Sequence, residues 1–313
     1  MKVKDFDDFR TPNRKPWLLF LVIAIAAAIA LHHFLPRKPA AEKEKSPPVE
    51  RGSEAEAAAA AGEQEPDVPA SVDDVELLKQ AKQCEADKDL PGARRRYLAL
   101  LDRTGNNKIR SEAEIRLGAV NVELVTTPWK MAEKTEYIVK KGDSVLRIAG
   151  RFGTTVELIQ KSNRLKNPHL IRPGDRFMIL QGKFAIHVRK SHNDVRLTLN
   201  DTFFKRYSVG TGEYGKTPIG TFVIKDKQKE PVWWHPSGKE IPYGDPENIL
   251  GTRWMAIQAT GDTPPARGYG IHGTWDESSI GKAVSAGCIR MRNKDVEELY
   301  MLVPLGTPVT IEE

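Results

Sequence analysis

Tyr269–Arg292 reads YGIHGTWDESSIGKAVSAGCIRMR and places one cysteine, Cys288, sixteen residues after His272. A cysteine attacks a carbonyl group as its thiolate, and a free thiol with a pKa of about 8.5 is mostly protonated at neutral pH. An adjacent imidazole can accept that proton, so the pair is typical of acyl-transfer enzymes. Gly287 allows a sharp turn before the cysteine, and the amides of Gly287 and Cys288 are candidates to stabilise an oxyanion.

Other segments complete a pattern around this stretch. They are the runs TPIGTF at 217–222, LGTRW at 250–254, HGT at 272–274, SAGCIR at 285–290 and VPLGTPVTI at 303–311. In this order they closely resemble the YkuD-type L,D-transpeptidases, whose signature is a His-Gly pair, a spacer, and then Gly-Cys with a basic residue two places on. The resemblance covers residues 183–313 and implies a β-rich catalytic domain.

The resemblance also implies a role for individual residues. Cys288 would be the nucleophile and His272 the base, because the position of a second histidine found in many members is Ala286 here. The remaining candidates are loop or oxyanion residues (Gly287, Ser285 and Gly273) and substrate-binding residues (Arg290, Tyr269, Trp233 and Trp234). The two tryptophans belong to a long aromatic loop at 226–250, which is either a lid over the substrate or ordinary packing.

The implied reaction is cleavage of the diaminopimelate–D-alanine bond of a peptidoglycan tetrapeptide stem through a cysteine acyl-enzyme. An amine acceptor would give a 3→3 cross-link or attach a protein to the wall. Water as acceptor would make the protein a carboxypeptidase or endopeptidase, and a weakly catalytic wall anchor is a third alternative. No cofactor is expected, and no metal, because His235 has no companion ligands at metal-binding spacing.

Residues 135–180 resemble a LysM module, with the order YIVKKGDS, then VLRIAGRF, VELIQKSN and LIRPGD. The resemblance implies a βααβ fold that binds N-acetylglucosamine polymers such as the glycan of peptidoglycan. The residues it assigns to the glycan groove lie in two loops, and they are Gly142, Asp143, Ser144, Asn167, Pro168, Leu170 and Ile171.

The N-terminal part indicates a membrane attachment. Trp17–Leu31, WLLFLVIAIAAAIAL, is free of charge, and continuing through His32, His33, Phe34 and Leu35 gives the segment 17–35, which nearly spans a hydrocarbon core of about 30 Å. A cleaved signal peptide is the alternative, but the only Ala-x-Ala sequence lies inside the apolar run, which favours an uncleaved signal anchor. We therefore expect a cytoplasmic segment 1–16, a single transmembrane helix 17–35 in the inner membrane, a disordered linker 36–70, and a catalytic domain outside the cytoplasm in the bacterial cell envelope.

Residues 71–130 show helical spacing of apolar side chains, and part of this region resembles a tetratricopeptide unit. One repeat cannot bury its apolar face alone, so we expect a small all-α spacer or a docking unit for a protein partner. The Pro91-Gly92 pair predicts a break between two helices. Cys84 is expected to be an apolar residue of the first helix.

The net charge of +6 and the pI of about 9.1 raise the possibility of nucleic-acid binding. However, basic residues are mixed with acidic ones along the chain, and no nucleic-acid motif is present. We expect no nucleic-acid partner, and attribute the charge to solvated faces and attraction to anionic lipid or wall polymers.

Overall fold

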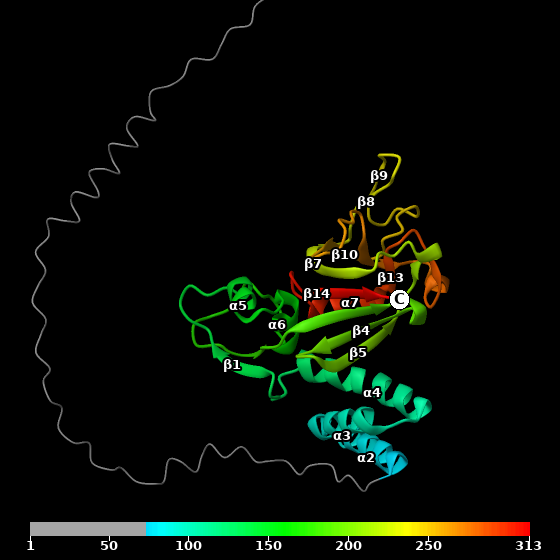
Figure 1. Cartoon of the computed structure of the whole chain (residues 1–313). Helices are drawn as coiled ribbons and strands as arrows, with labels where there is room; N and C mark the ends of the chain where they lie inside the picture. The colour runs from blue at the N-terminus through cyan, green and yellow to red at the C-terminus, as the bar shows by residue number, and fades with distance from the viewer. Residues whose placement is uncertain (1–72) are drawn as a thin grey trace, which may run out of the picture. The chain divides into compact units, whose positions relative to one another are not determined.

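A computed structural model describes residues 73–313, in which helices, a βααβ module and a large mixed sheet follow one another along the chain (Figure 1). The predicted N-terminal segment 1–16, the signal anchor 17–35 and the linker 36–70 lie outside the described residues. Within 73–313, no helix combines the length and the apolar character that a bilayer crossing requires.

The helical region contains α2 (Asp74–Ala86), α3 (Leu90–Arg103) and α4 (Asn107–Thr126). The predicted break between two helices is present, but it lies at residues 87–89 rather than at Pro91-Gly92, which lie in the first turn of α3. Proline is tolerated there since the first helical amides have no partner within the helix. The side chain of Asp89 accepts the amide of Gly92 at 2.9 Å and so begins the helix.

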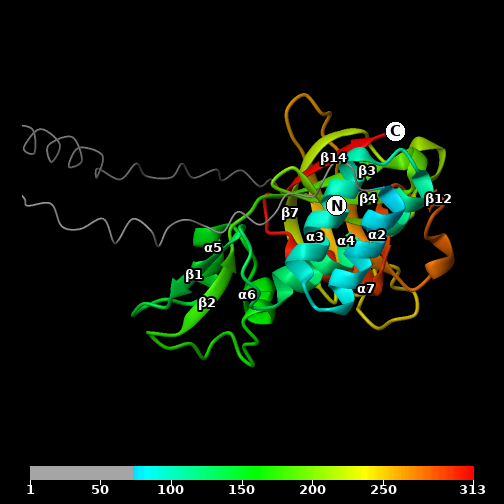
Figure 2. The same ribbon diagram turned by 90° about the horizontal axis from the view of Figure 1, so that it is seen from below.

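Helix α4 packs against the catalytic sheet rather than standing free. Its Asn121 donates to the carbonyl of Phe204 at 2.8 Å. Its Glu114 is only 3% exposed and pairs with Arg196 at 3.1 Å and Arg206 at 3.4 Å. Figure 2, turned by 90° from Figure 1, also shows α4 beside the strands of this sheet. The helical region therefore supports the catalytic domain, a role that the sequence did not reveal.

The βααβ module is present as predicted. Strand β1 (Lys134–Ile138) pairs antiparallel with β2 (Arg176–Leu180), and α5 (Val145–Phe152) and α6 (Val156–Ser162) lie between them in the chain. Ser144 begins α5 by accepting the amide of Arg147, and Thr155 begins α6 by accepting the amide of Leu158 at 2.9 Å.

The catalytic domain is built on an eight-stranded mixed sheet with the order β13-β11-β10-β7-β14-β3-β4-β5. Most neighbours are antiparallel, but β11–β13 and β14–β3 are parallel. The strand bounds are β3 Phe184–Arg189, β4 Asp194–Leu199, β5 Thr202–Ser208, β7 Gly220–Lys229, β10 Arg253–Ala259, β11 Gly270–Thr274, β13 Ile289–Arg292 and β14 Pro308–Glu312.

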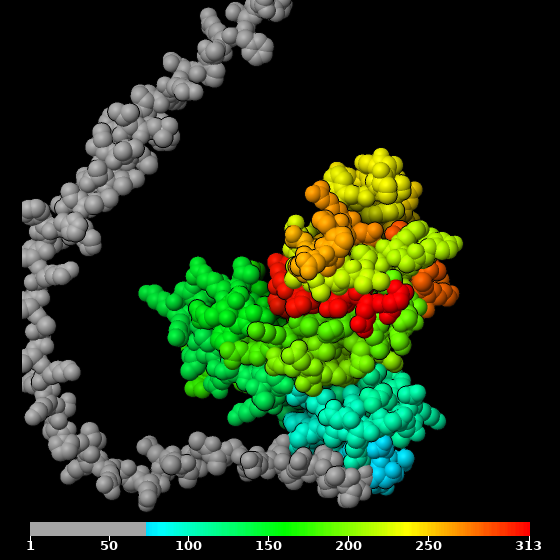
Figure 3. Space-filling model, in the orientation of Figure 1, coloured from blue at the N-terminus to red at the C-terminus, as the bar shows by residue number. Residues whose placement is uncertain are grey.

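Shorter elements complete the domain. Helix α7 (Asn293–Leu302) follows β13 and packs on β10, β11 and β13. The two-residue strands β8 (Trp233–Trp234) and β9 (Glu240–Ile241) form a hairpin that projects from the domain (Figure 3). Strand β6 (Thr211–Gly212) pairs with β12 (Ala283–Ser285), and the 3-10 turns are Lys190–His192, Glu213–Gly215 and Glu277–Ser279. Side chains from β11, β13 and α7 share one hydrophobic core.

Candidate active site

Cys288 is held by the tight loop that joins β12 to β13. The hydroxyl of Ser285 donates to the carbonyl of Cys288 at 2.7 Å and accepts the amide of Gly287 at 3.0 Å. The hydroxyl of Thr217 donates to the carbonyl of Gly287 at 2.9 Å. Ser285 and Thr217 are buried, so water does not compete for these bonds and they fix the loop firmly.

Gly287 occupies a position that only glycine can fill. Its φ is +132°, and a Cβ atom there would lie 2.5 Å from Cε1 of Tyr269. The ring of Tyr269 therefore packs directly on the loop. The oxyanion contact predicted for the Gly287 amide is not free in this structure, because that N–H already donates to Ser285.

The sheet brings His272 to the same face as Cys288. Strands β11 and β13 are parallel, with His272 opposite Arg290 and Ile271 opposite Ile289. Successive side chains of a strand point to opposite faces, so Cys288 and Arg290 share one face, and His272 lies on it beside them. Ile271 and Ile289 point the other way, into the core.

His272 is enclosed by protein. It is 2% exposed, and the indole of Trp254 stacks on its ring with the centroids 5.7 Å apart. The Nδ1 atom lies 2.6 Å from the carbonyl of Gly273. A carbonyl only accepts, so Nδ1 carries the proton and Nε2 keeps a lone pair.

The electrostatic environment favours a neutral imidazole. Burial lowers the pKa of His272 to about 4, and the positive charge of Arg290 also lowers it, against an opposing effect of the carbonyls of Gly273 and Leu250. At neutral pH the ring is therefore uncharged and can accept a proton.

The thiol of Cys288 is neutral at rest as well. Burial raises its pKa, while a hydrogen bond with the backbone of Gly270 and the charge of Arg290 oppose that rise. The Sγ atom lies 3.6 Å from the carbonyl of Gly268 as a weak donor. A neutral thiol and a neutral imidazole that line the same cavity suit a reaction in which the proton moves as the sulfur attacks.

Both residues line one cavity of about 550 Å³. Its charged lining consists of two arginines, Arg267 and Arg290, and includes no carboxylate, so an anionic ligand is favoured there. The rest of the lining is aromatic (Trp233, Trp234, Trp254 and Tyr269), aliphatic (Val232, Pro236, Ile249, Leu250 and Ala286) or polar (Gln228 and Ser285). The size and composition are typical of a pocket for a small peptide.

Comparison with known proteins places this geometry in a family. Residues 183–311 match the L,D-transpeptidase catalytic domain, and residues 137–179 match the LysM domain. The putative L,D-transpeptidase YkuD of Bacillus subtilis is 36% identical over 184 residues, which is 56% of this chain and 97% of the relative. The chain belongs to the YkuD-type L,D-transpeptidase family.

Other relatives of the L,D-transpeptidase family extend the comparison. The putative L,D-transpeptidase YqjB of Bacillus subtilis is 39% identical over 142 residues, 45% of this chain and 73% of the relative. A solved L,D-transpeptidase from Mycobacterium tuberculosis H37Rv aligns at 18% identity with a TM-score of 0.35, covering 45% of this chain and 70% of that one. On the strength of the two domain matches and the curated relatives, the protein is an L,D-transpeptidase family enzyme that acts on peptidoglycan in the cell envelope.

The L,D-transpeptidase site gathers most of the residues predicted from the sequence. The cavity lining includes the predicted Cys288, His272, Arg290, Ser285, Tyr269, Trp233 and Trp234. Gly287 and Gly273 lie behind the lining. A Cβ on Gly273 would be 2.2 Å from the amide oxygen of Asn293, so this glycine permits close packing of β11 against the start of α7.

Among the lining residues that were not predicted as site residues, Trp254 and Arg267 contribute most to the site. Trp254 was visible only as part of the LGTRW run, and nothing in its spacing indicated that it stacks on His272. Arg267 precedes Gly268 in the β10–β11 loop and borders the thiol only because that loop folds back over it. In the described residues, neither arginine of the cavity has an ion-pair partner.

The residues assigned to the LysM glycan groove are used in different ways. Asp143 accepts from the hydroxyl of Tyr137 at 2.6 Å and from the amide of Lys140 at 2.8 Å, which stabilises the loop that begins at Gly142. Asn167 accepts the amide of His169 at 2.9 Å. Leu170, 77% exposed, lines a shallow cleft of about 430 Å³ together with Ile171. The other five assigned residues, Gly142, Asp143, Ser144, Asn167 and Pro168, do not line that cleft.

Proposed function

We propose that this enzyme is a peptidoglycan L,D-transpeptidase that acts through a thioester on Cys288. The observation that carries the proposal is the placement of Cys288, His272 and Arg290 on one sheet face, in a cavity whose charged lining consists of two arginines. The donor is a tetrapeptide stem, whose carboxylates suit that positive cavity.

In the first half-reaction, Nε2 of His272 takes the proton of the Cys288 thiol as the sulfur attacks the carbonyl carbon of diaminopimelate. The resulting oxyanion is stabilised by the Cys288 amide, since the Gly287 amide is engaged by Ser285. The carbon–nitrogen bond then breaks, and the imidazolium gives its proton to the amine of the departing D-alanine. A thioester between the stem and Cys288 remains.

In the second half-reaction, an amine from a second stem attacks the thioester carbonyl. His272 removes a proton from that amine, and the sulfur leaves and is reprotonated. The product is a 3→3 cross-link, or a protein attached to the wall when the amine belongs to a protein. Attack by water instead of an amine makes the same site a carboxypeptidase.

The aromatic hairpin favours the amine. Trp233 and Trp234 line the cavity from β8, and Trp234 is 67% exposed. We propose that the hairpin covers the bound stem and excludes water from the thioester. Arg290 holds a substrate carboxylate, and the buried Nε of this side chain has no hydrogen-bond partner among residues 73–313.

We further propose that residues 17–35 anchor the protein in the cytoplasmic membrane, with residues 36–70 as a linker and the catalytic domain outside. The loops of the LysM module that carry Gly142–Ser144 and Asn167–Ile171 bind the glycan. Leu170 and Ile171 support this because they line a surface cleft.

The test incubates the full chain with tetrapeptide-stem muropeptides and analyses the products by mass spectrometry, with a Cys288→Ala variant as control. Cross-linked dimers that have lost D-alanine, absent in the control, are the expected result. Tripeptide monomers alone would assign the protein as a carboxypeptidase. No reaction, with glycan binding retained, would leave only a wall anchor.

A further inference from the structure

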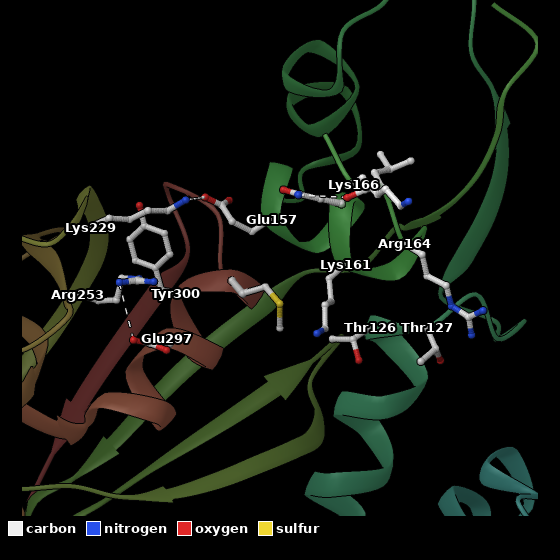
Figure 4. A pocket seen from close by; sticks show the side chains of 13 residues that line it. Thr126, Thr127, Glu157, Lys161, Arg164, Lys166, Lys229, Arg253, Glu297 and Tyr300 are labelled. Atoms are coloured by element: carbon white, nitrogen blue, oxygen red, sulfur yellow. Dashed lines mark hydrogen bonds and ion pairs between the residues drawn. The ribbon is translucent and has the colours of Figure 1, made fainter. Parts of the chain in front are cut away.

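A second cleft, separate from the candidate active site, opens where α4, the LysM module and the catalytic domain meet (Figure 4). Its volume is about 620 Å³. One wall consists of α6 and the turn after it. The opposite wall consists of the end of β7, the start of β10 and α7. The last residues of α4 close the cleft. The lining includes Lys161, Arg164 and Lys166 on the LysM side and Lys229 and Arg253 on the catalytic side.

The two walls are fixed relative to each other. The hydroxyl of Thr155 at the start of α6 donates to the carbonyl of Met301 in α7. Leu158 of α6 belongs to the same hydrophobic core as the catalytic strands. Lys229 and Glu157 form an ion pair of 2.7 Å across the cleft (Figure 4). The cleft is therefore preformed, so a ligand would bind without ordering it.

The charges of the cleft are not balanced. Its two carboxylates are already paired, Glu157 with Lys229 and Glu297 with Arg253 at 3.9 Å. The side chains of Lys161, Arg164 and Lys166 form no hydrogen bond or ion pair with any residue in 73–313. All three side chains are exposed, and they border one concavity, where their fields add.

Arg164 lies in the turn that ends α6, where its amide donates to the carbonyl of Lys161 at 3.2 Å and the amide of Leu165 donates to the carbonyl of Gln160 at 2.9 Å. Its φ is +54°, a left-handed conformation just after α6 that favours glycine or asparagine. An arginine is strained in this conformation, and its guanidinium has no hydrogen bond or ion pair among the described residues.

The cleft lies on the opposite side of the sheet from Cys288. Lys229 pairs with Arg253 in the register of β7 and β10, and the next pair, Gln228 and Trp254, lines the active-site cavity. Neighbouring residues of a strand face opposite ways. A stem bound in this cleft is therefore not the stem that Cys288 attacks.

The chemistry of the cleft favours a carboxylate-bearing peptide over a sugar. The ring of Tyr300 is approached by Lys227 Nζ at 4.1 Å and by Arg253 at 5.6 Å, so cations occupy the aromatic surface that a sugar would stack on. Leu165 and Met301 supply apolar contacts that suit the methyl groups of alanine residues. Leu165 and Lys166 also lead directly into the loop Asn167–Ile171, the proposed glycan contact.

We propose that this cleft is a second peptidoglycan-binding site, in which Lys161, Arg164 and Lys166 hold the carboxylates of a stem peptide that is not being processed. The proposal rests on the proposed function only in taking peptidoglycan as the ligand of the chain. A glycan on the LysM loop would place its neighbouring stems at this cleft. The site then increases affinity for the intact wall polymer, which offers several stems at once.

The experiment measures binding of the full chain to purified sacculi, before and after their stem carboxyl groups are converted to amides. The test variant carries Lys161→Glu, Arg164→Glu and Lys166→Glu. A matched control carries Lys183→Glu, Lys225→Glu and Lys294→Glu, three exposed lysines of the catalytic domain outside both clefts. We expect the test variant to bind native sacculi about tenfold more weakly than wild type. The control variant should bind native sacculi as wild type does. All three proteins should bind amidated sacculi equally.

A single variant, Arg164→Asn, distinguishes a loss of binding from a loss of folding. Asparagine relieves the left-handed strain, so the thermal midpoint should hold or rise while binding to native sacculi falls. Equal binding of wild type to native and amidated sacculi would overturn the proposal. Loss of binding only when phosphate polymers are stripped from the sacculi would also overturn it, in favour of a phosphate ligand. Turnover of a soluble tetrapeptide stem by wild type is measured beside these assays, so that a failure of the proposed function is recognised separately.

Discussion

Replacing Ser285 by alanine removes the two hydrogen bonds that hold Cys288 in its loop. The hydroxyl donates to Cys288 O at 2.7 Å and accepts the Gly287 amide at 3.0 Å, and the side chain is 2% exposed. A buried polar group left without a partner costs about 1–3 kcal/mol. With two such groups we expect a loss of about 2–6 kcal/mol in the free energy of unfolding, or about 4–24 °C in Tm.

The same change should move the thiol. A displacement of about 1 Å at a reacting atom can cost about 100-fold in rate, so kcat for muropeptide cross-linking should fall by that order while the affinity for the donor changes little. The assays are urea unfolding and product analysis by mass spectrometry.

Ser279 provides the matched control for this prediction. It is also 2% exposed, and its hydroxyl makes one hydrogen bond, to the carbonyl of Asp276 at 2.6 Å, outside the candidate active site. Ser279→Ala should cost about half as much stability and leave kcat near the wild-type value. If Ser285→Ala kept full turnover, or lost no more stability than Ser279→Ala, the loop would not be held as described.

Further predictions follow from burial and backbone geometry. His272→Ala should lower kcat at least about 100-fold, the usual contribution of a general base. In the wild type the acid limb of kcat/KM should lie near pH 4 rather than 6.5, because the pKa of His272 is lowered to about 4. Between about pH 6.5 and about pH 4 the imidazole of His272 is protonated in the unfolded chain but not in the native protein. The free energy of unfolding should therefore fall by about 3 kcal/mol as the pH drops from 7 to 4. Urea titrations of His272→Gln should not show this loss. Gly251→Ala should destabilise the protein by about 3 kcal/mol or more, since φ is +64° and the new Cβ would lie 2.5 Å from the carbonyl carbon of Gly273. Gly244→Ala, whose Cβ would point into open space, should cost about 1 kcal/mol. Calorimetry compares the two variants. Trp234→Ala should leave Tm within about 2 °C because the side chain is 67% exposed, yet raise the KM for the donor stem about fivefold if the hairpin contacts it.

The local features of the fold were predictable from the sequence, and the contacts between its parts were not. The LysM order and the His-Gly and Gly-Cys runs are continuous in the chain, so short-range patterns suffice to find them. The docking of α4 depends on Asn121 and Phe204, which are 83 positions apart, and on two arginines that come together at Glu114 only after β4 and β5 have paired. No spacing rule reports such contacts.

The candidate site divides in the same way. Cys288, His272 and Arg290 lie on two strands that the family pattern marks, whereas Arg267 reaches the cavity through a loop and Trp254 through the register of β10 with β11. The prediction for the Gly287 amide shows a second limit. An amide in the right place can already be engaged, and Ser285, two residues earlier, engages it.

The shared core of α4, α6 and the catalytic strands affects whether a domain of this protein can be exchanged with one from another enzyme. Val125 and Leu158, from outside the catalytic domain, are fully or almost fully buried among residues of that domain. A wall-binding module on a tether can be exchanged between enzymes by recombination without repair on either side. Here an exchange would expose apolar surface on both partners at once, so a transplanted LysM module would need compensating substitutions on both sides of this contact.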